Sequence, residues 1–154
     1  MREALREAER ALAANEVPIG AVIVLEGQII GRGHNCVESD RDPTAHAEIV
    51  ALRHATTTIA AWRLTGASVF VTMEPCPMCI GALLLGRVSS LYFGCYDPRQ
   101  GAVGSLFDLS AHPGLGHQIR VYPEVLAEPA TALLKTFFAK CRKNGEIMER
   151  CPSG

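Results

Sequence analysis

The chain has 154 residues, of which 48% are hydrophobic and 20% charged, and its formal net charge is −1. These values are typical of one globular unit, so we expect a single domain over residues 1–154. A net charge this close to zero is a poor match for a protein that coats nucleic acid broadly, but it does not exclude a local basic patch. With no apolar run of membrane-spanning length and no signal-peptide core, we expect a cytoplasmic protein without a membrane partner.

The first part of the chain predicts a helix followed by a hairpin. Residues 2–15 place apolar side chains at helical spacing opposite charged ones, which indicates an amphipathic helix. The apolar run 19–25 and the segment 28–34 are typical of two strands that a tight turn at Gly27 would join. The polar stretch 36–43 predicts a loop.

The middle of the chain alternates between helix and strand patterns. We expect a helix over 45–61 with Thr44 as its N-cap, and then a buried strand over 67–73. A second helix should run through Pro77 and the apolar residues that follow it, before a strand over 88–95. A strand–helix–strand unit predicts parallel pairing, and parallel sheets place their sites at the carboxyl ends of strands.

The last part of the chain begins with residues 96–117, which are rich in glycine and proline and show little periodicity. A long ordered loop in a compact domain is often functional. A short strand over 119–122 and a helix opened by Pro129, with basic residues near its end, should complete the fold. The tail that runs to Gly154 is expected to be frayed.

Two short motifs carry the chemistry, namely His46-Ala47-Glu48 and Pro75-Cys76-Pro77-Met78-Cys79. Cysteines three residues apart lie on one face of a helix, and a helix N-terminus favours the thiolate form that binds metals. One imidazole and two thiolates are the three protein ligands of a catalytic zinc, which keeps its fourth position for water. The H-x-E and P-C-x-x-C pair is the established signature of zinc deaminases, with the glutamate as general acid and base.

Each motif taken alone is also compatible with a different kind of site. A Cys-x-x-Cys pair can be a redox pair or half of a structural zinc site, and a structural site needs a fourth ligand. The remaining cysteines offer no partner at ligand spacing: Cys36, Cys95, Cys141 and Cys151. We therefore favour the catalytic zinc, and expect the other thiols to be free rather than part of a disulfide framework.

Five stretches carry a resemblance to a known family: Glu16–Val22, Gly33–Asn35, Asp42–Glu48, Glu74–Cys79 and Asp97–Leu106. Across most of its length the chain resembles bacterial tRNA adenosine deaminases of the TadA type, within the cytidine deaminase-like superfamily. The zinc motifs specify only the superfamily, and the last of the five stretches is what favours the tRNA enzymes. The resemblance implies an α/β fold, a three-layer α/β/α arrangement with a five-stranded mixed sheet, and a homodimer with one Zn²⁺ per subunit.

The resemblance also implies an activity and a role for each site residue. The expected reaction is hydrolytic deamination of the wobble adenosine to inosine in the anticodon stem-loop of a tRNA, typically arginine tRNA. The residues that match the zinc ligands are His46, Cys76 and Cys79. Glu48 matches the proton shuttle that serves the zinc-activated hydroxide, and Asn35 matches a residue that hydrogen-bonds the flipped base. Asp97 matches a position near the nucleotide's sugar, and Phe138 matches one that packs near the flipped anticodon bases.

Two other functions stay open at this point. A zinc-dependent deaminase of a free base or nucleotide, such as guanine, cytosine, cytidine or deoxycytidylate, would share both motifs. A non-catalytic RNA-binding module stabilised by zinc is less favoured, because such a site has no use for Glu48 beside an open metal. The chain also departs from the family at Gly116, where an asparagine is usual, so the conformation of that loop is an open question.

Overall fold

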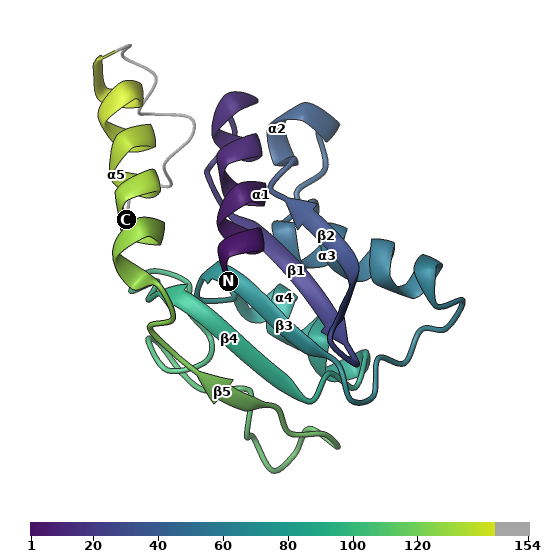
Figure 1. The fold of residues 1–154 in the computed structure, drawn as a ribbon. Helices are drawn as coiled ribbons and strands as arrows, with labels where there is room; N and C mark the ends of the chain where they lie inside the picture. Colours follow the sequence, from purple (N-terminus) through teal and green to yellow (C-terminus); the bar gives the residue numbers. More distant parts are fainter. Residues whose placement is uncertain (144–154) are drawn as a thin grey trace.

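A five-stranded mixed sheet lies between two layers of helices, as the computed structural model shows (Figure 1). The structure describes residues 1–143, so the tail expected to be frayed lies outside the described residues. The strands, in sheet order, are β2 (Gln28–His34), β1 (Gly20–Leu25), β3 (Ser68–Met73), β4 (Ser90–Cys95) and β5 (Arg120–Tyr122). The predicted three-layer α/β/α fold is confirmed.

Five helices accompany the sheet within the described residues: α1 (Arg2–Ala13), α2 (Val37–Asp40), α3 (Ala47–Thr58), α4 (Pro77–Leu85) and α5 (Ala127–Lys143). Helices α1 and α5 cover one face of the sheet, and α3 and α4 lie behind the other (Figure 1). No described helix combines the length and the apolar character needed to cross a bilayer.

The pairing of the strands follows from the connections between them. β1 pairs antiparallel with β2 through a two-residue turn, in which Glu26 and Gly27 both have positive φ, 50° and 79°. Such turns match the right-handed twist of a hairpin. β3 pairs parallel with β4 across α4, and β4 pairs parallel with β5, as the strand–helix–strand pattern predicts for the first pair. The carboxyl ends of β3 and β4 therefore meet at one edge, where the functional motifs begin.

Helix α3 lies very close to β2 because two strand residues on its side have no side chain. A Cβ on Gly31 or Gly33 would run into the backbone of α3, and the one on Gly33 would lie 2.5 Å from the carbonyl oxygen of Ala47. The facing helix residues are small and fully buried: Ala47, Ala51 and Ala55. This close contact fixes the distance between the sheet and the N-terminal end of α3, where His46 and Glu48 lie.

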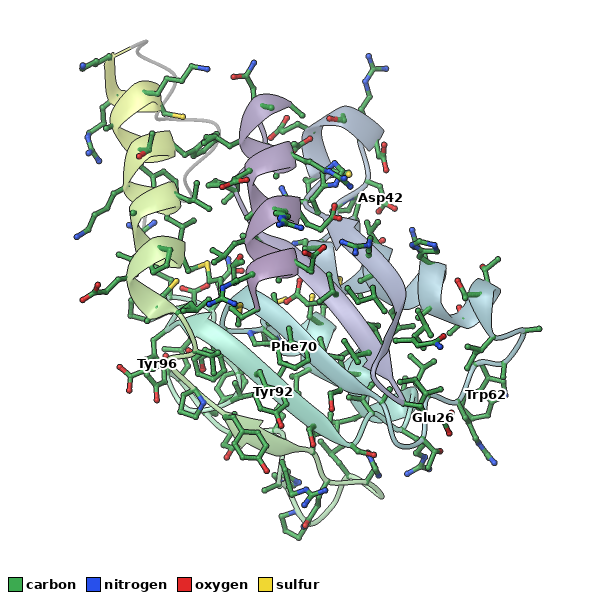
Figure 2. All side chains as sticks on the ribbon, in the orientation of Figure 1. Glu26, Asp42, Trp62, Phe70, Tyr92 and Tyr96 are labelled. Carbon is green, nitrogen blue, oxygen red and sulfur yellow. The ribbon has the colours of Figure 1, made fainter. Side chains whose placement is uncertain are left out.

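The main core fills the space between the sheet and the α3/α4 layer. Its largest members are Ile23, Leu64, Ile80, Leu83, Leu91 and Phe93, each fully buried. On the opposite face, Phe70, Tyr92 and Tyr122 stack across β3, β4 and β5 with ring centroids 4.5 Å apart. Figure 2 labels the first two of these rings. Cross-strand aromatic pairs of this kind stabilise strand register.

Two predictions of local structure are wrong. Thr44 is not the N-cap of α3, because its backbone N–H and its hydroxyl both donate to Asp42 Oδ1, at 2.8 and 2.7 Å, and close a turn. The helix begins later, and His46 occupies the N-cap position. The segment 36–43 is also not merely a loop, since α2 forms within it against the side chain of Glu16.

Candidate metal and catalytic site

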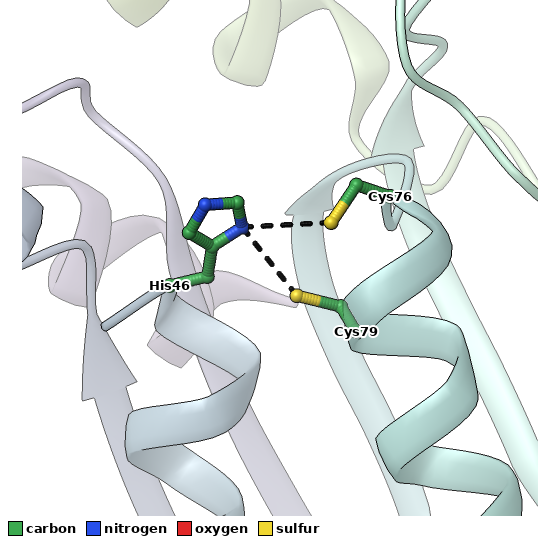
Figure 3. A group of neighbouring side chains, drawn as sticks. All are labelled: His46, Cys76 and Cys79. Atoms are coloured by element: carbon green, nitrogen blue, oxygen red, sulfur yellow. Dashed lines mark hydrogen bonds between the residues drawn. The ribbon is translucent and has the colours of Figure 1, made fainter. Parts of the chain in front are cut away.

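The two motifs meet because each begins a helix at the same edge of the sheet. His46 is the N-cap residue of α3 and Cys76 is the N-cap residue of α4, both with extended backbone. Pro77 follows in the first turn of α4, where the absence of an N–H costs nothing. Cys79 lies one turn further along the same face. Figure 3 shows the imidazole directed at both sulfur atoms.

The distances between the three side chains fit a tetrahedral metal. His46 Nδ1 lies 3.6 Å from Cys76 Sγ and 3.5 Å from Cys79 Sγ. Bond lengths of about 2.1 Å to nitrogen and about 2.3 Å to sulfur separate such ligands by about 3.6 Å around zinc. One imidazole nitrogen carries at most one proton, so it cannot donate to both sulfurs at once. A cation shared by the three side chains better explains why two sulfurs converge on that nitrogen. Within the described residues, these three side chains are the only group of this kind that could hold a metal ion.

The two thiols are electrostatically unequal. A hydrogen bond from Cys79, helped by His46, lowers the pKa of Cys76 to about 4. The same hydrogen bond, together with burial, raises the pKa of the Cys79 thiol. These opposite shifts favour ionisation of Cys76 over Cys79 when no metal is bound. A divalent ion would displace the proton of Cys79, since metal ligands must be deprotonated.

Glu48 lies beside these ligands in the first turn of α3 and is almost fully buried. Burial is the largest influence on its carboxyl group and raises the pKa of Glu48 to about 7. His46, Cys76 and Cys79 all act on this group electrostatically, so it belongs to the same cluster. A carboxyl group that titrates near neutral pH is suited to accept and return protons.

Asn35 directly follows the carboxyl end of β2. The backbone N–H of the next residue, Cys36, donates to the carbonyl of Ala45 at 3.0 Å, which ties this strand end to the residue before His46. The Asn35 side chain is 6% exposed, and its Nδ2 donates to Glu16 Oε2 at 3.1 Å. The residue predicted to contact substrate is therefore linked, through its neighbour, to the segment that leads into His46.

Asp97 lies on a loop that winds around the carboxylate of Glu74. Glu74 is 3% exposed and accepts the backbone N–H groups of Asp97, Val103 and Ser105 at 3.0 to 3.1 Å, and also the Ser105 hydroxyl. A Cβ on Gly101 would collide with the same carboxylate, so the loop closes tightly. Glu74 lies two residues before Cys76, so the residue that holds this loop by hydrogen bonds also belongs to the segment that leads into α4.

The paired phenylalanines of α5 differ in burial, as expected for adjacent helix positions. Phe137 is 2% exposed and belongs to the core, whereas Phe138 is partly exposed and meets it edge to face. In the basic end of this helix, Lys140 donates to Asn15 Oδ1 at 2.7 Å, while Arg142 and Lys143 are exposed. Phe138 is therefore the one available to a ligand.

The loop around Gly116 is held without an asparagine side chain. Arg87 Nη1 donates to the carbonyl oxygen of Gly116 at 2.6 Å, and His117 Nε2 lies 2.6 Å from the carbonyl oxygen of Val88. Nothing lies within 4 Å of a Cβ built at residue 116, so the glycine is not required by crowding. These two backbone contacts account for the conformation of the loop.

The other described cysteines are free thiols and lie outside the cluster. Cys36 Sγ lies 3.2 Å from the carbonyl oxygen of His34, and Cys95 Sγ lies 3.5 Å from that of Thr72. Among residues 1–143, no fourth side chain joins His46, Cys76 and Cys79. The geometry thus resembles a three-ligand site more than a closed structural one.

Comparison with known proteins agrees with this site. A family model for the MafB19-like deaminases matches residues 1–142. The tRNA-specific adenosine deaminase of Bacillus subtilis (strain 168) is 44% identical over 143 residues, which are 93% of this chain and 89% of that protein. The chain belongs to the tRNA-specific adenosine deaminase family.

Solved structures separate this deaminase family from a neighbouring one. A structure from a study of A-to-I editing by tRNA:A34 deaminases at the wobble position of transfer RNA has a TM-score of 0.84 and 41% identity, over 87% of this chain and 97% of that one. A guanine deaminase from Nitrosomonas europaea has a TM-score of 0.73 and 28% identity, over 88% and 81%. This adenosine deaminase family member is thus more similar to the first of the two structures.

Sequence reasoning missed two residues of this deaminase site, Glu16 and Glu74. Both are buried carboxylates whose hydrogen bonds hold site segments in place. A glutamate at the end of a buried strand, directly before Pro75-Cys76, was the available signal for Glu74. No local pattern pointed to Glu16, because its partners lie 19 or more residues away.

Proposed function

We propose that this chain hydrolyses the exocyclic amine of the wobble adenosine in a tRNA anticodon, releasing ammonia and leaving inosine. The choice of substrate is supported by the similarity to solved structures. The chain is more similar to the structure from the study of tRNA:A34 deaminases than to a guanine deaminase, with 41% against 28% identity and a TM-score of 0.84 against 0.73. The chemistry is carried by the convergence of His46, Cys76 and Cys79 beside Glu48.

The proposed cofactor is one Zn²⁺ per subunit, held by His46 Nδ1 and the sulfurs of Cys76 and Cys79. The ligand set of one nitrogen and two sulfurs and the separations of 3.5 and 3.6 Å both suit this ion. When bound, zinc supplies Lewis acidity that lowers the pKa of water to near neutrality.

Glu48 is proposed to move the protons of the reaction. Its carboxylate takes one proton from the attacking water and delivers it to N1 of the adenine. It then takes the remaining proton from the new C6 hydroxyl and gives it to the departing amine, so that C6–O replaces C6–N and ammonia leaves. A pKa raised to about 7 by burial lets one group act as base and then as acid. An unpaired base in an anticodon loop is inexpensive to flip into such a site.

The proposed substrate contacts come from three other parts of the chain. Asn35 approaches from the end of β2 and Asp97 from the loop after β4, while Phe138 offers a partly exposed ring on α5 for stacking on anticodon bases. Arginine tRNA as the substrate and the homodimer follow from the family resemblance, the cytoplasmic location follows from the sequence composition, and all three stay predictions.

An anticodon stem-loop with a wobble adenosine tests this proposal directly. The zinc-loaded protein is incubated with that stem-loop and, separately, with free guanine and with cytidine, and inosine and ammonia are measured. We expect inosine from the stem-loop and no product from the free compounds. Guanine turnover with an inert stem-loop would assign the chain to the free-base deaminases instead. Tight RNA binding without ammonia release would favour the non-catalytic module.

A further inference from the structure

Glu16 is a buried carboxylate outside the metal cluster, on the segment between α1 and β1. It is 1% exposed, and four donors surround its two oxygens. Oε1 accepts the backbone N–H and the hydroxyl of Ser39, both at 2.7 Å, and Oε2 accepts Asn35 Nδ2 at 3.1 Å and the Glu38 N–H at 3.3 Å. An ionised carboxylate offers about four lone-pair sites and no donor, so all its capacity is used.

This arrangement determines which way the amide of Asn35 points. An amide has an oxygen end and a nitrogen end that differ in hydrogen-bonding character. Only the nitrogen end can face Glu16, since an oxygen placed there would meet a carboxylate oxygen with no proton between them. The hydrogen-bonding partners, rather than the shape of the side chain, therefore impose the orientation.

The oxygen end of Asn35 is left without a donor within the described part of the chain. The residue is 6% exposed, its backbone N–H is used by Ile19 at 3.0 Å, and its Nδ2 is used by Glu16. No polar side-chain atom among residues 1–143 is both fully buried and unpartnered, so the Oδ1 of Asn35 keeps access to its surroundings. Asn35 lies near the segment that leads into His46, since the next residue bonds to Ala45.

We propose that Glu16 is a positioning residue that holds Asn35 with its amide oxygen toward the substrate, as an acceptor for an N–H or O–H donor of the target nucleotide. This inference rests on the proposed function, because it gives that nucleotide a specific contact. Glu16 does not touch the substrate and acts only through Asn35. The pair thereby determines that Asn35 accepts, rather than donates, the hydrogen bond it makes with the target nucleotide.

The inference is tested by exchanging the carboxylate of Glu16 and the amide of Asn35 between the two positions. In Glu16→Gln an NH₂ group would face the Asn35 NH₂ group, and Asn35 relieves this by turning its nitrogen outward, which presents a donor where an acceptor is needed. In Asn35→Asp two carboxylates would face each other. In the double variant E16Q/N35D, the glutamine NH₂ donates to the aspartate and an oxygen of residue 35 faces outward again.

The expected result is a loss in each single variant and a recovery in the double one. From the strength of hydrogen bonds to charged groups, kcat/KM on the stem-loop should fall roughly ten- to a hundredfold in E16Q and in N35D. The double variant should regain about tenfold or more over the poorer single variant. If Glu16 served only to hold residues 38 and 39, adding N35D to E16Q would worsen activity, and that outcome would overturn the inference.

Ser39→Ala is the matched control. It removes one hydroxyl donor from Oε1 of Glu16 and leaves the contact of Oε2 with Asn35 in place. Its kcat/KM should stay within about threefold of wild type. A loss as large as that of E16Q would show that the whole carboxylate network matters rather than the orientation of Asn35.

Thermal unfolding separates failure of this inference from failure of the proposed function. The orientation requires the double variant to unfold at a higher temperature than either single variant, and this measurement needs no substrate. If wild type forms no inosine but the double variant recovers its melting temperature, the proposed function fails and the pairing stands. If wild type is active and neither activity nor melting temperature recovers, the inference fails alone.

A stem-loop with 2′-deoxyadenosine at the wobble position identifies the donor that Asn35 accepts. If the donor is the ribose hydroxyl, Asn35→Ala should cost activity on the ribose substrate and nothing further on the deoxy substrate. If the donor is on the base, the cost should be equal on both. A variant Asn35→Ala that is as active as wild type on both substrates would contradict the contact itself.

Discussion

His46 Nδ1 lies 3.6 Å from the sulfur of Cys76, although 30 residues of chain separate the two positions. Each residue starts a different helix, and each helix packs on the same face of the sheet. The site therefore exists only when both helices are docked. Its metal affinity and the packing of α3 and α4 should be coupled, so that a change in one alters the other.

Replacement of His46 should abolish the link between metal and stability. Zinc that binds only the folded state, at a free concentration a hundredfold above its Kd, should stabilise wild type by about 2.7 kcal/mol. In His46→Ala this stabilisation by zinc should vanish, because only two of the three ligands, both of them sulfurs, are left to bind the ion. Urea unfolding with and without zinc, together with metal stoichiometry, measures both effects. His112→Ala, in the exposed loop after β4, should behave as wild type. Equal stabilisation of His46→Ala and wild type would contradict the ligand assignment.

Glu48→Gln should separate metal binding from turnover. Glutamine keeps the shape of the buried side chain but cannot carry a proton, so zinc should stay bound at one per chain. The loss of general acid and base catalysis should lower kcat by about 10²- to 10⁴-fold. Single-turnover formation of inosine and the zinc content of the purified variant check this pair of outcomes. Near-normal turnover would assign the proton transfers to another group.

Removal of the Glu74 carboxylate should loosen the loop from Asp97 to Ser105. Glu74→Ala leaves three backbone N–H groups and one hydroxyl without their acceptor. Unsatisfied buried donors of this kind should lower the free energy of unfolding by about 3 kcal/mol. Hydrogen exchange should accelerate at the amides of Asp97, Val103 and Ser105. Glu9→Ala, at an exposed position of α1, serves as the control and should change neither quantity.

A methyl group at Gly33 should damage the site from a distance. A Cβ there would lie 2.5 Å from the carbonyl oxygen of Ala47 and against the backbone of Ala51, so α3 must move away from β2. Overpacking of this kind costs about 1–3 kcal/mol. Because His46 and Glu48 flank Ala47, Gly33→Ala should also lose zinc affinity and activity.

Gly81→Ala is the opposite case and provides the comparison. Gly81 lies within α4, and nothing is within 4 Å of a Cβ built there. Alanine in a helix interior should stabilise the protein by about 0.5–1 kcal/mol. The melting temperatures of the two alanine variants should therefore change in opposite directions, and only Gly33→Ala should lose zinc affinity. A stable, zinc-loaded Gly33→Ala would show that α3 can shift without moving the ligands.

The fold could be predicted largely from the sequence because its signals are local. The tight turn of the hairpin is encoded at Gly27, and the parallel pairing of β3 and β4 follows from the helix between them. Thr44 failed as an N-cap because Asp42 competes for its hydroxyl, a local choice that residue type alone does not decide. The short helix α2 was missed because Glu16, distant in sequence, supports it.

By itself, the sequence determined the chemistry: one imidazole, two thiols spaced one helical turn apart and a neighbouring carboxyl group, within a pattern typical of deaminases. These properties reside in residue types and short spacings. Only the tertiary structure decided that His46 and the cysteines lie at tetrahedral ligand separations, that Asn35 presents its oxygen outward, and that Glu16 and Glu74 hold the adjoining segments. The physical reason is that each of these depends on contacts between residues 19 to 33 positions apart, which form only when helices and sheet pack together.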